Sequence, residues 1–127
     1  MSEKKLFICE HCGNIVEMVR KSGVPVVCCG KPMTEIVANT VEASVEKHLP
    51  VVSIDNGIVN VKVGSVTHPM LPEHHIEWIY LETSKGIKRN ALNVDGEPET
   101  AFALTEDEKP IAVYEYCNLH GLWKTEL

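Results

Sequence analysis

The chain has 127 residues, 44% of them hydrophobic, and a formal net charge of -6, which allows one ordinary domain or a domain with a small module attached. The acidic balance argues against nucleic acid as a partner, because phosphate backbones are bound by clustered Lys and Arg. No stretch approaches the roughly 18 apolar residues of a membrane helix, and no hydrophobic segment follows the charged N-terminus, so we expect a cytoplasmic protein without a membrane partner.

The first segment, residues 1–37, is rich in cysteine and glycine and is too short to bury a core of its own. It contains the motif CEHC, followed by Gly13, and the motif CCGKP. Below about 40 residues a module generally needs a metal, a disulfide or a partner chain to fold. In a reducing compartment cysteines serve as metal ligands more often than as disulfides, so residues 1–37 are predicted to form a metal-binding module.

Four cysteines are the candidate ligands of this module: Cys9, Cys12, Cys28 and Cys29. The C-x2-C spacing of the first pair lets two sulfurs of one tight turn bind the same ion, and the adjacent pair supplies the other two. Four thiolates select zinc or iron in a tetrahedral site. Structural zinc sites usually present two C-x2-C turns, so the adjacent pair favours iron while zinc stays open. His11, between the first two cysteines, is expected to be an exposed loop residue.

The remaining residues, 38–127, have the pattern of short strands and turns. The Asn56-Gly57 dipeptide between two alternating runs indicates a hairpin with a type I′ turn. No sustained 3.6-residue periodicity occurs, so we predict an all-β chain whose second domain is an antiparallel β-sandwich of immunoglobulin-like architecture, with the strand order left open. The roughly seven expected strands, in chain order, are 40–46, 51–55, 58–63, 75–83, 87–94, 99–104 and 111–117.

Histidines at strand ends and in loops of this second domain suggest a second metal site. A single histidine is more often a surface or core residue than a ligand. His48, however, lies just before Pro50, and His68 and His74 flank a proline-rich loop that cannot be helical. Successive side chains of a strand point to opposite faces, so only one of His74 and His75 is expected to reach a shared ion. We select His74 and expect His75 to be solvated.

The fifth cysteine lies far from the other four. Cys117 and His120 have a chelating spacing within a turn, in which Asn118 and Gly121 are expected to give the backbone freedom. Cys117 is therefore predicted to be a ligand of the second metal.

These motifs together resemble the desulfoferrodoxin family, the two-iron class of superoxide reductase, along essentially the whole chain. The segment CEHC…CCGKPM is similar to the desulforedoxin module, which is rubredoxin-like, and EKHLPVV, THPMLPEHHIEWIYL and YEYCNLHGLW are similar to the three ligand-bearing segments of the catalytic domain. The resemblance implies two mononuclear iron ions per chain, one in an Fe(Cys)4 centre and one with five protein ligands and an open sixth position. These five ligands are His48, His68, His74 and His120 in an equatorial plane and Cys117 on the axis.

The resemblance also implies a reaction, the one-electron reduction of superoxide to hydrogen peroxide without release of dioxygen. It implies that Glu46 binds the ferric iron after turnover and that Lys47 steers and orients the oxygen species; from the residues alone the two are a solvated pair on a loop. The Fe(Cys)4 centre would relay electrons from a rubredoxin-like donor, and a homodimer would shorten the path between the irons.

Two other interpretations compete with this one. A zinc ribbon joined to a β-sandwich would be a colourless binding module with one zinc per chain. A pure electron carrier would use its second domain only to dock partners, which leaves Cys117 without a role.

Overall fold

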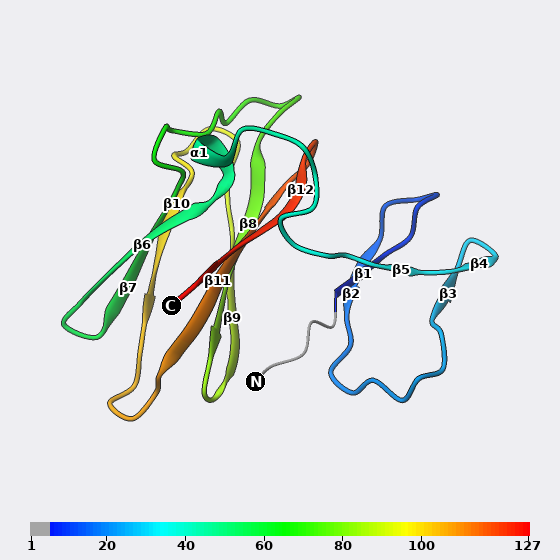
Figure 1. The fold of residues 1–127 in the computed structure, drawn as a ribbon, viewed down its shortest axis with the longest axis horizontal. Coiled ribbons are helices and arrows are strands. Elements are labelled where there is room, and N and C mark those ends of the chain that lie inside the picture. Colours follow the sequence, from blue (N-terminus) through cyan, green and yellow to red (C-terminus); the bar gives the residue numbers. More distant parts are fainter. Residues whose placement is uncertain (1–5) are drawn as a thin grey trace. The chain divides into compact units, whose positions relative to one another are not determined.

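The structure, a computed structural model, describes residues 6–127, and it divides into two compact units with the boundary between Val37 and Ala38. Almost all of the regular structure is β-strand, as Figure 1 shows. Within the described residues the one helix is α1 (Val45–His48), which is a single turn. The prediction of an all-β chain is therefore confirmed.

The first unit consists of very short strands. A three-stranded antiparallel sheet has the order β2-β1-β5, and β3 and β4 form a separate hairpin. The hydrophobic side chains buried in the described part of this unit are only Leu6, Cys9 and Met33. Such limited burial agrees with a module that depends on a metal ion for its stability. The strands are β1 (Leu6–Ile8), β2 (Ile15–Glu17), β3 (Val27–Cys28), β4 (Lys31–Pro32) and β5 (Thr34–Glu35).

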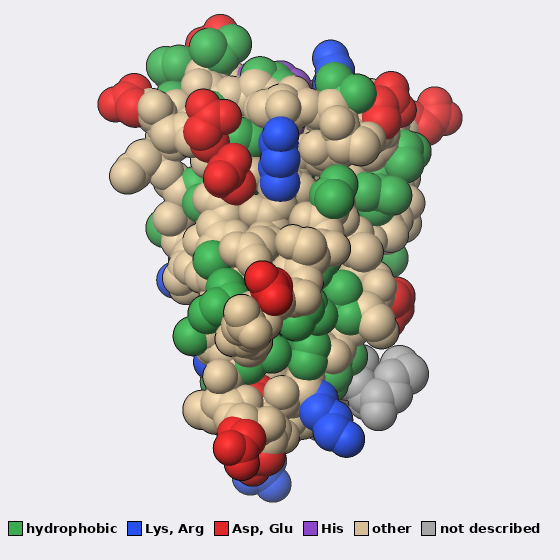
Figure 2. Space-filling view, turned by 90° about the vertical axis from the view of Figure 1, so that its left-hand side faces the viewer, with side chains coloured by type: hydrophobic (Ala, Val, Ile, Leu, Met, Phe, Trp, Pro, Cys, Tyr) green, Lys and Arg blue, Asp and Glu red, His purple; other side chains and the backbone are tan. Residues whose placement is uncertain are grey.

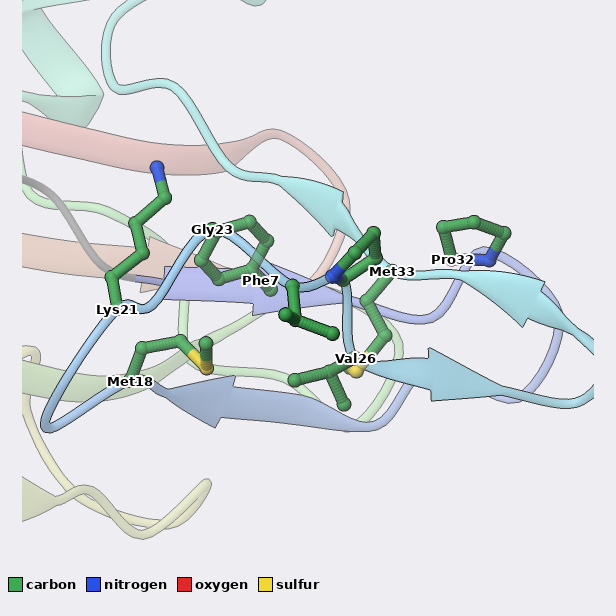
Figure 3. A pocket seen from close by; sticks show the side chains of 9 residues that line it. Phe7, Met18, Lys21, Gly23, Val26, Pro32 and Met33 are labelled. Carbon is green, nitrogen blue, oxygen red and sulfur yellow. The ribbon is translucent and has the colours of Figure 1, made fainter.

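An apolar hollow of about 260 Å³ lies in the first unit, and Figure 3 shows the side chains that line it, among them Phe7, Val26 and Met33. The Nζ atom of Lys21 lies 5.4 Å from the centre of the Phe7 ring, a cation–π distance. No cysteine lines the hollow, so it is separate from any thiolate site.

The second unit is a sandwich of two antiparallel sheets. One sheet has the order β10-β7-β6 and the other the order β12-β11-β8-β9, and the two form separate layers in Figure 1. This three-plus-four arrangement confirms the predicted immunoglobulin-like sandwich. The strands are β6 (Pro50–Asp55), β7 (Ile58–Val63), β8 (Ile76–Thr83), β9 (Gly86–Ala91), β10 (Glu99–Ala103), β11 (Pro110–Cys117) and β12 (Gly121–Glu126).

The core lies between these sheets and follows from the alternation of the sequence. Along β7, Val59, Val61 and Val63 are buried while Asn60 and Lys62 are exposed, as expected for a strand with one face in the core. Side chains of β8, β10 and β11 complete the same cluster, and Cys117 belongs to it. The predicted hairpin is also confirmed, because Asn56 and Gly57 have φ values of 50° and 75° between β6 and β7.

In the second unit one predicted strand is wrong and one strand was missed, and the five short strands of the first unit were not predicted. Residues 40–46 form no strand, and their last two belong to α1. The alternation there does not reflect burial, since Val41 and Val45 are 41% and 52% exposed. The missed strand is β12, where the neighbouring Leu122 and Trp123 are both buried and interrupt the period of two.

One face of the molecule carries charged side chains of both signs. On the side shown in Figure 2, acidic and basic side chains are interspersed with small hydrophobic areas, and histidine atoms are visible only at the upper edge. No single sign of charge gathers on this face. Within residues 6–127, none of the helical structure is long and apolar enough for a membrane crossing.

Candidate metal centres

The four cysteines of the first unit meet in one group, which we call the cysteine centre. Cys9 and Cys12 lie in the loop after β1, and Cys28 and Cys29 lie at the end of β3 and in the following turn. Their sulfur atoms all lie within 4.8 Å of one another, and Cys12 Sγ is 3.7 Å from Cys28 Sγ. None of them is in a disulfide. The structure thus brings together all four predicted ligands of this site.

The adjacent pair converges on one point because of an unusual backbone conformation. Cys29 has a φ of 54° and Gly30 a φ of 77°, so both residues between Cys28 and β4 have the left-handed backbone conformation. Neighbouring side chains that diverge in an extended strand can then face the same ion. The left-handed conformation of Cys29 thus lets an adjacent pair of cysteines serve one metal site.

The electrostatics of the cysteine centre suit a cation. The backbone N–H of Cys12 donates to Cys9 Sγ at 3.5 Å, and such hydrogen bonds lower the pKa of Cys9 to about 6. Side-chain hydrogen bonds with the neighbouring sulfurs of Cys12 and Cys9 raise the pKa of Cys29 to about 12, and repulsion from the Cys12 thiolate adds to this shift. A bound metal ion removes this repulsion by holding all four sulfurs as thiolates. Four sulfurs fit zinc or iron.

A second group, the histidine centre, forms at one end of the sandwich from three separate segments. His48 ends α1, His68 and His74 lie in the connection between β7 and β8, and Cys117 and His120 lie at the turn between β11 and β12. Figure 1 shows α1 and the β7–β8 connection at the same end of the two sheets. The structure therefore collects all five predicted ligands of the second metal.

The four imidazole rings of the histidine centre form a closed ring of neighbours. The centroids of successive rings, in the order His48, His68, His74, His120, are 4.6 to 5.1 Å apart, and each pair is steeply inclined. The centroids of His48 and His74 are 6.4 Å apart, so these two rings occupy opposite corners. This is the arrangement of four equatorial ligands around one point.

The nitrogen and sulfur atoms that face this point are close enough to share one ion. His48 Nε2 lies 3.2 Å from His68 Nε2 and 3.2 Å from His120 Nδ1. Cys117 Sγ lies 3.5 Å from His68 Nε2 and 3.8 Å from His120 Nδ1. The Nε2 atom of His74 is buried and has no hydrogen-bond partner among residues 6–127. Each of the five side chains thus directs one donor atom inward.

The tautomers of two histidines require a cation between them. His48 Nδ1 lies 2.7 Å from the carbonyl oxygen of Ser44, and His68 Nδ1 lies 2.8 Å from that of Pro69. A carbonyl oxygen only accepts, so both Nδ1 atoms carry the proton and both Nε2 atoms present lone pairs to each other. Burial lowers the pKa of both rings, that of His68 to about 4, so neither is a cation at neutral pH. A metal ion removes the repulsion between these lone pairs.

The thiol of Cys117 completes a donor set suited to ferrous iron. Burial raises the pKa of this thiol, so without a cation it stays protonated in the core. A metal ion shifts it to the thiolate. Four neutral imidazoles and one thiolate are ligands that iron accepts, and they leave one of six coordination positions free for a small ligand.

Trp123 and Asn118 support the histidine centre through contacts that the sequence did not predict. The Trp123 ring stacks on His48 with centroids 4.9 Å apart, and Trp123 Nε1–H donates to the carbonyl oxygen of His120 at 3.1 Å. The backbone of Asn118 is not in the left-handed conformation, whereas that of Gly121 is, with a φ of 78°. Its side chain instead accepts from His75 N–H at 2.8 Å and donates to Glu73 O at 3.1 Å. The only sequence signal was the position of both residues within three of His120.

A buried carboxylic acid also lies near this centre. Glu115 is fully buried on β11, and neither carboxyl oxygen has a hydrogen-bond partner in the described part of the chain. Burial raises the pKa of Glu115 to about 9, so the group is neutral at pH 7. Nothing in the sequence distinguished this glutamate from an outward-facing one.

The other singled-out residues lie outside the two ligand groups. His11 is exposed, and His75 is partly exposed, with its Nδ1 donating to the Leu71 carbonyl oxygen at 2.9 Å. Glu46 and Lys47 have exposed side chains on α1, directly before the buried His48. A hydrogen bond from its own backbone N–H lowers the pKa of Glu46, so it is a carboxylate at neutral pH.

Comparison with known proteins agrees with this architecture. A four-cysteine module combined with a four-histidine, one-cysteine centre on an immunoglobulin-like sandwich defines a protein with two mononuclear iron centres. The family profile described as desulfoferrodoxin matches residues 40–126, and the profile of the desulfoferrodoxin N-terminal domain matches residues 2–36. The chain belongs to the desulfoferrodoxin family.

Individual relatives cover from about two thirds to nearly all of the chain. A desulfoferrodoxin of Syntrophotalea carbinolica is 47% identical over an alignment of 127 residues, and the alignment covers 99% of this chain and 99% of that one. The crystal structure of the superoxide reductase from Treponema pallidum is 43% identical and has a TM-score of 0.83, covering 98% of this chain and 100% of that one. A superoxide reductase of Giardia intestinalis is 30% identical with a TM-score of 0.55, covering 65% of this chain and 99% of that one.

Proposed function

We infer that the chain is a superoxide reductase, an oxidoreductase that converts superoxide to hydrogen peroxide by adding one electron and two protons. The observation that carries this function is the convergence of five donor atoms from three segments, with facing lone pairs that require a cation. Similarity over 98% of the chain to the superoxide reductase from Treponema pallidum supports it. When bound, ferrous iron supplies the electron, and its thiolate ligand strengthens electron donation toward the free coordination position.

We propose that Glu46 and Lys47 are the catalytic residues beside this centre. Both are exposed on the turn whose last residue is the ligand His48. Lys47 attracts the superoxide anion and orients it or the water that protonates it, and this attraction weakens as salt rises. Glu46, a carboxylate at neutral pH, would bind the oxidised iron and would release it on reduction.

The two structural units correspond to two functional domains in this proposal. Residues 1–37 are the iron-binding, electron-transfer domain, and residues 38–127 are the catalytic domain, matching the division at Val37. Cys12 and Cys29 are exposed, which brings the thiolates of the cysteine centre within reach of a redox partner. That partner is a rubredoxin-like electron donor.

Two further properties belong to the proposal. The chain forms a homodimer, which is supported by exposed apolar side chains on the small first unit, where Val19, Val24 and Val27 are 91%, 71% and 62% exposed. The protein works in the cytoplasm, where free thiols of this kind persist as metal ligands.

Metal analysis with an optical spectrum of the natively purified protein tests this function first. We expect two irons per chain, visible thiolate-to-iron absorption and oxidation of the ferrous histidine centre by superoxide, with hydrogen peroxide as product. A colourless protein with one zinc per chain and no reaction with superoxide supports the zinc-ribbon binding module instead.

A further inference from the structure

The turn that carries Glu46 and Lys47 lies directly on the backbone of a glycine. Gly64 is buried in the connection between β7 and β8. A Cβ atom at this position would lie 2.5 Å from the carbonyl oxygen of Glu46 and 2.8 Å from the carbonyl carbon of Lys47. Both neighbours are main-chain atoms, so neither can rotate away. Gly64 is not among the glycines with positive φ, so its requirement for glycine is argued from the space beside it and not from a left-handed φ.

Two hydrogen bonds hold the same turn from the same side. The backbone N–H of Val66 donates to Glu46 O at 2.9 Å, and the hydroxyl of Ser65 donates to it at 3.2 Å. We call Gly64, Ser65 and Val66 the 64–66 clamp. The clamp combines a close approach that only glycine allows with two donors on a single acceptor.

The turn has little internal support. Helix α1 has four residues, and its N-cap Ser44 makes no side-chain capping bond. Its backbone bonds include Lys47 N–H to Ser44 O at 3.3 Å and Leu49 N–H to Val45 O at 3.0 Å, and the side chain of its last residue, His48, also donates to Ser44 O at 2.7 Å. An isolated helical turn is unstable in water because nucleation fixes several residues for one hydrogen bond. The conformation of this turn therefore depends on its packing against neighbouring segments, of which the clamp is the one that contacts the Glu46 and Lys47 main chain.

The clamp is also continuous with the histidine centre. Two residues after Val66 comes the ligand His68, whose N–H donates to Val63 O at 3.0 Å. One residue after Lys47 comes the ligand His48. The side chains of Glu46 and Lys47 are exposed, so their placement beside the centre is set by the main chain beneath them.

We propose that the 64–66 clamp is a positioning element of the reaction: it fixes the Glu46–Lys47 turn relative to the histidine centre, with Gly64 as its required residue. The roles of Glu46 and Lys47 are those of the proposed function, on which this inference rests. The clamp touches neither superoxide nor iron, and it acts through the turn that it holds.

Gly64→Ala tests the close approach, and Gly96→Ala is the matched control. Gly96 is another loop glycine outside the positive-φ group, and a Cβ there would come no closer than 3.5 Å to its nearest neighbour. We expect amide hydrogen exchange at Val66 to become about tenfold faster in Gly64→Ala, the effect of losing one hydrogen bond, and to stay unchanged in Gly96→Ala. Iron and the thiolate absorption of the histidine centre should be retained in both.

The reaction rate gives the second readout. At low ionic strength Gly64→Ala should react with superoxide several-fold more slowly than the wild type, and its rate should depend less on salt because Lys47 is displaced. Unchanged Val66 exchange together with an unchanged rate and salt dependence would overturn the proposal. Loss of iron from the histidine centre in folded Gly64→Ala would also overturn it, since Gly64 would then support the ligands themselves.

Variants of Ser65 keep the proposal testable if Gly64→Ala does not fold. Ser65→Ala removes one donor to Glu46 O, whereas Ser65→Thr keeps it on this exposed side chain. We expect faster exchange at Val66 and a weaker salt dependence in Ser65→Ala, with both restored in Ser65→Thr; equal behaviour of the two variants would overturn the clamp. If the wild-type protein fails to reduce superoxide, the proposed function is refuted. Amide exchange at Val66 in the same protein does not depend on that activity, so it tests the clamp separately.

Discussion

Trp123 is predicted to determine how tightly iron is held in the histidine centre, through its two separate contacts. The ring is only 3% exposed and stacks on His48, while its Nε1–H donates to His120 O. Trp123→Phe keeps an aromatic surface but removes the donor, and a single hydrogen bond is worth about 0.5–1.5 kcal/mol. Trp123→Ala removes both contacts and leaves a cavity, which costs about 3–5 kcal/mol.

These magnitudes separate an effect on metal binding from an effect on folding. Outer partners of metal ligands typically contribute about 10–100-fold to metal affinity. We expect Trp123→Phe to lose iron to a competing chelator about tenfold more readily, with a small change in thermal unfolding, and Trp123→Ala to be impaired in both. Trp78→Phe is the control, because Trp78 stacks on Tyr116 with centroids 5.5 Å apart and contacts no predicted ligand. If Trp123→Phe and Trp78→Phe lose iron equally, the reasoning is refuted.

Three further predictions concern single side chains. Cys117→Ser should abolish the absorption band of the histidine centre and leave that of the cysteine centre intact, since the two thiolate groups lie in different units; unchanged optical spectra would contradict the ligand assignment. Lys47→Met should slow the reaction with superoxide by about tenfold at low ionic strength, with the difference shrinking as salt is added, and stopped-flow measurements at several salt concentrations decide this. A hydrogen bond from Thr83, with help from Lys88, lowers the pKa of Glu108 to about 2 from 4.5. The stabilisation by this carboxylate is therefore complete above pH 4.5 and is lost as the pH falls toward 2, so Glu108→Gln should reduce stability at pH 7 but not near pH 2 in urea unfolding.

Strands with one buried face were the predictable part of the fold. In β7 every second residue is a buried valine, and the Asn56-Gly57 turn fixes the register of the hairpin. Residues 40–46 show the limit of this approach, because an alternating sequence predicts a strand only when a neighbouring strand edge is available. This segment is instead fixed near its two ends: just before it, Asn39 accepts from Lys124 N–H and donates to Lys124 O, and at its end Glu46 O accepts from Val66 N–H.

The ligands were predictable for a different reason. Cysteine and histidine carry their chemistry in the residue type, and short spacings such as that of Cys117 and His120 place two donors in one turn. Supporting contacts carry no such signal. The stacking of Trp123 on His48 joins residues that are 75 positions apart, and the contact of Gly64 with the Glu46 carbonyl involves no side chain at all. Such contacts follow from how the loops pack and become visible only in three dimensions.

The net charge of -6 and an anionic substrate are compatible because the field at the site is local. Four neutral imidazoles and one thiolate leave a ferrous ion with a formal charge of about +1, and Lys47 is the next residue before a ligand. Charges beyond about 8–10 Å are largely screened at physiological salt, so the acidic residues spread over the rest of the surface act weakly on an anion that is already near the centre. The overall charge therefore predicts solubility and the rejection of polyanions, whereas the sign of a small substrate follows from the few groups around the ion.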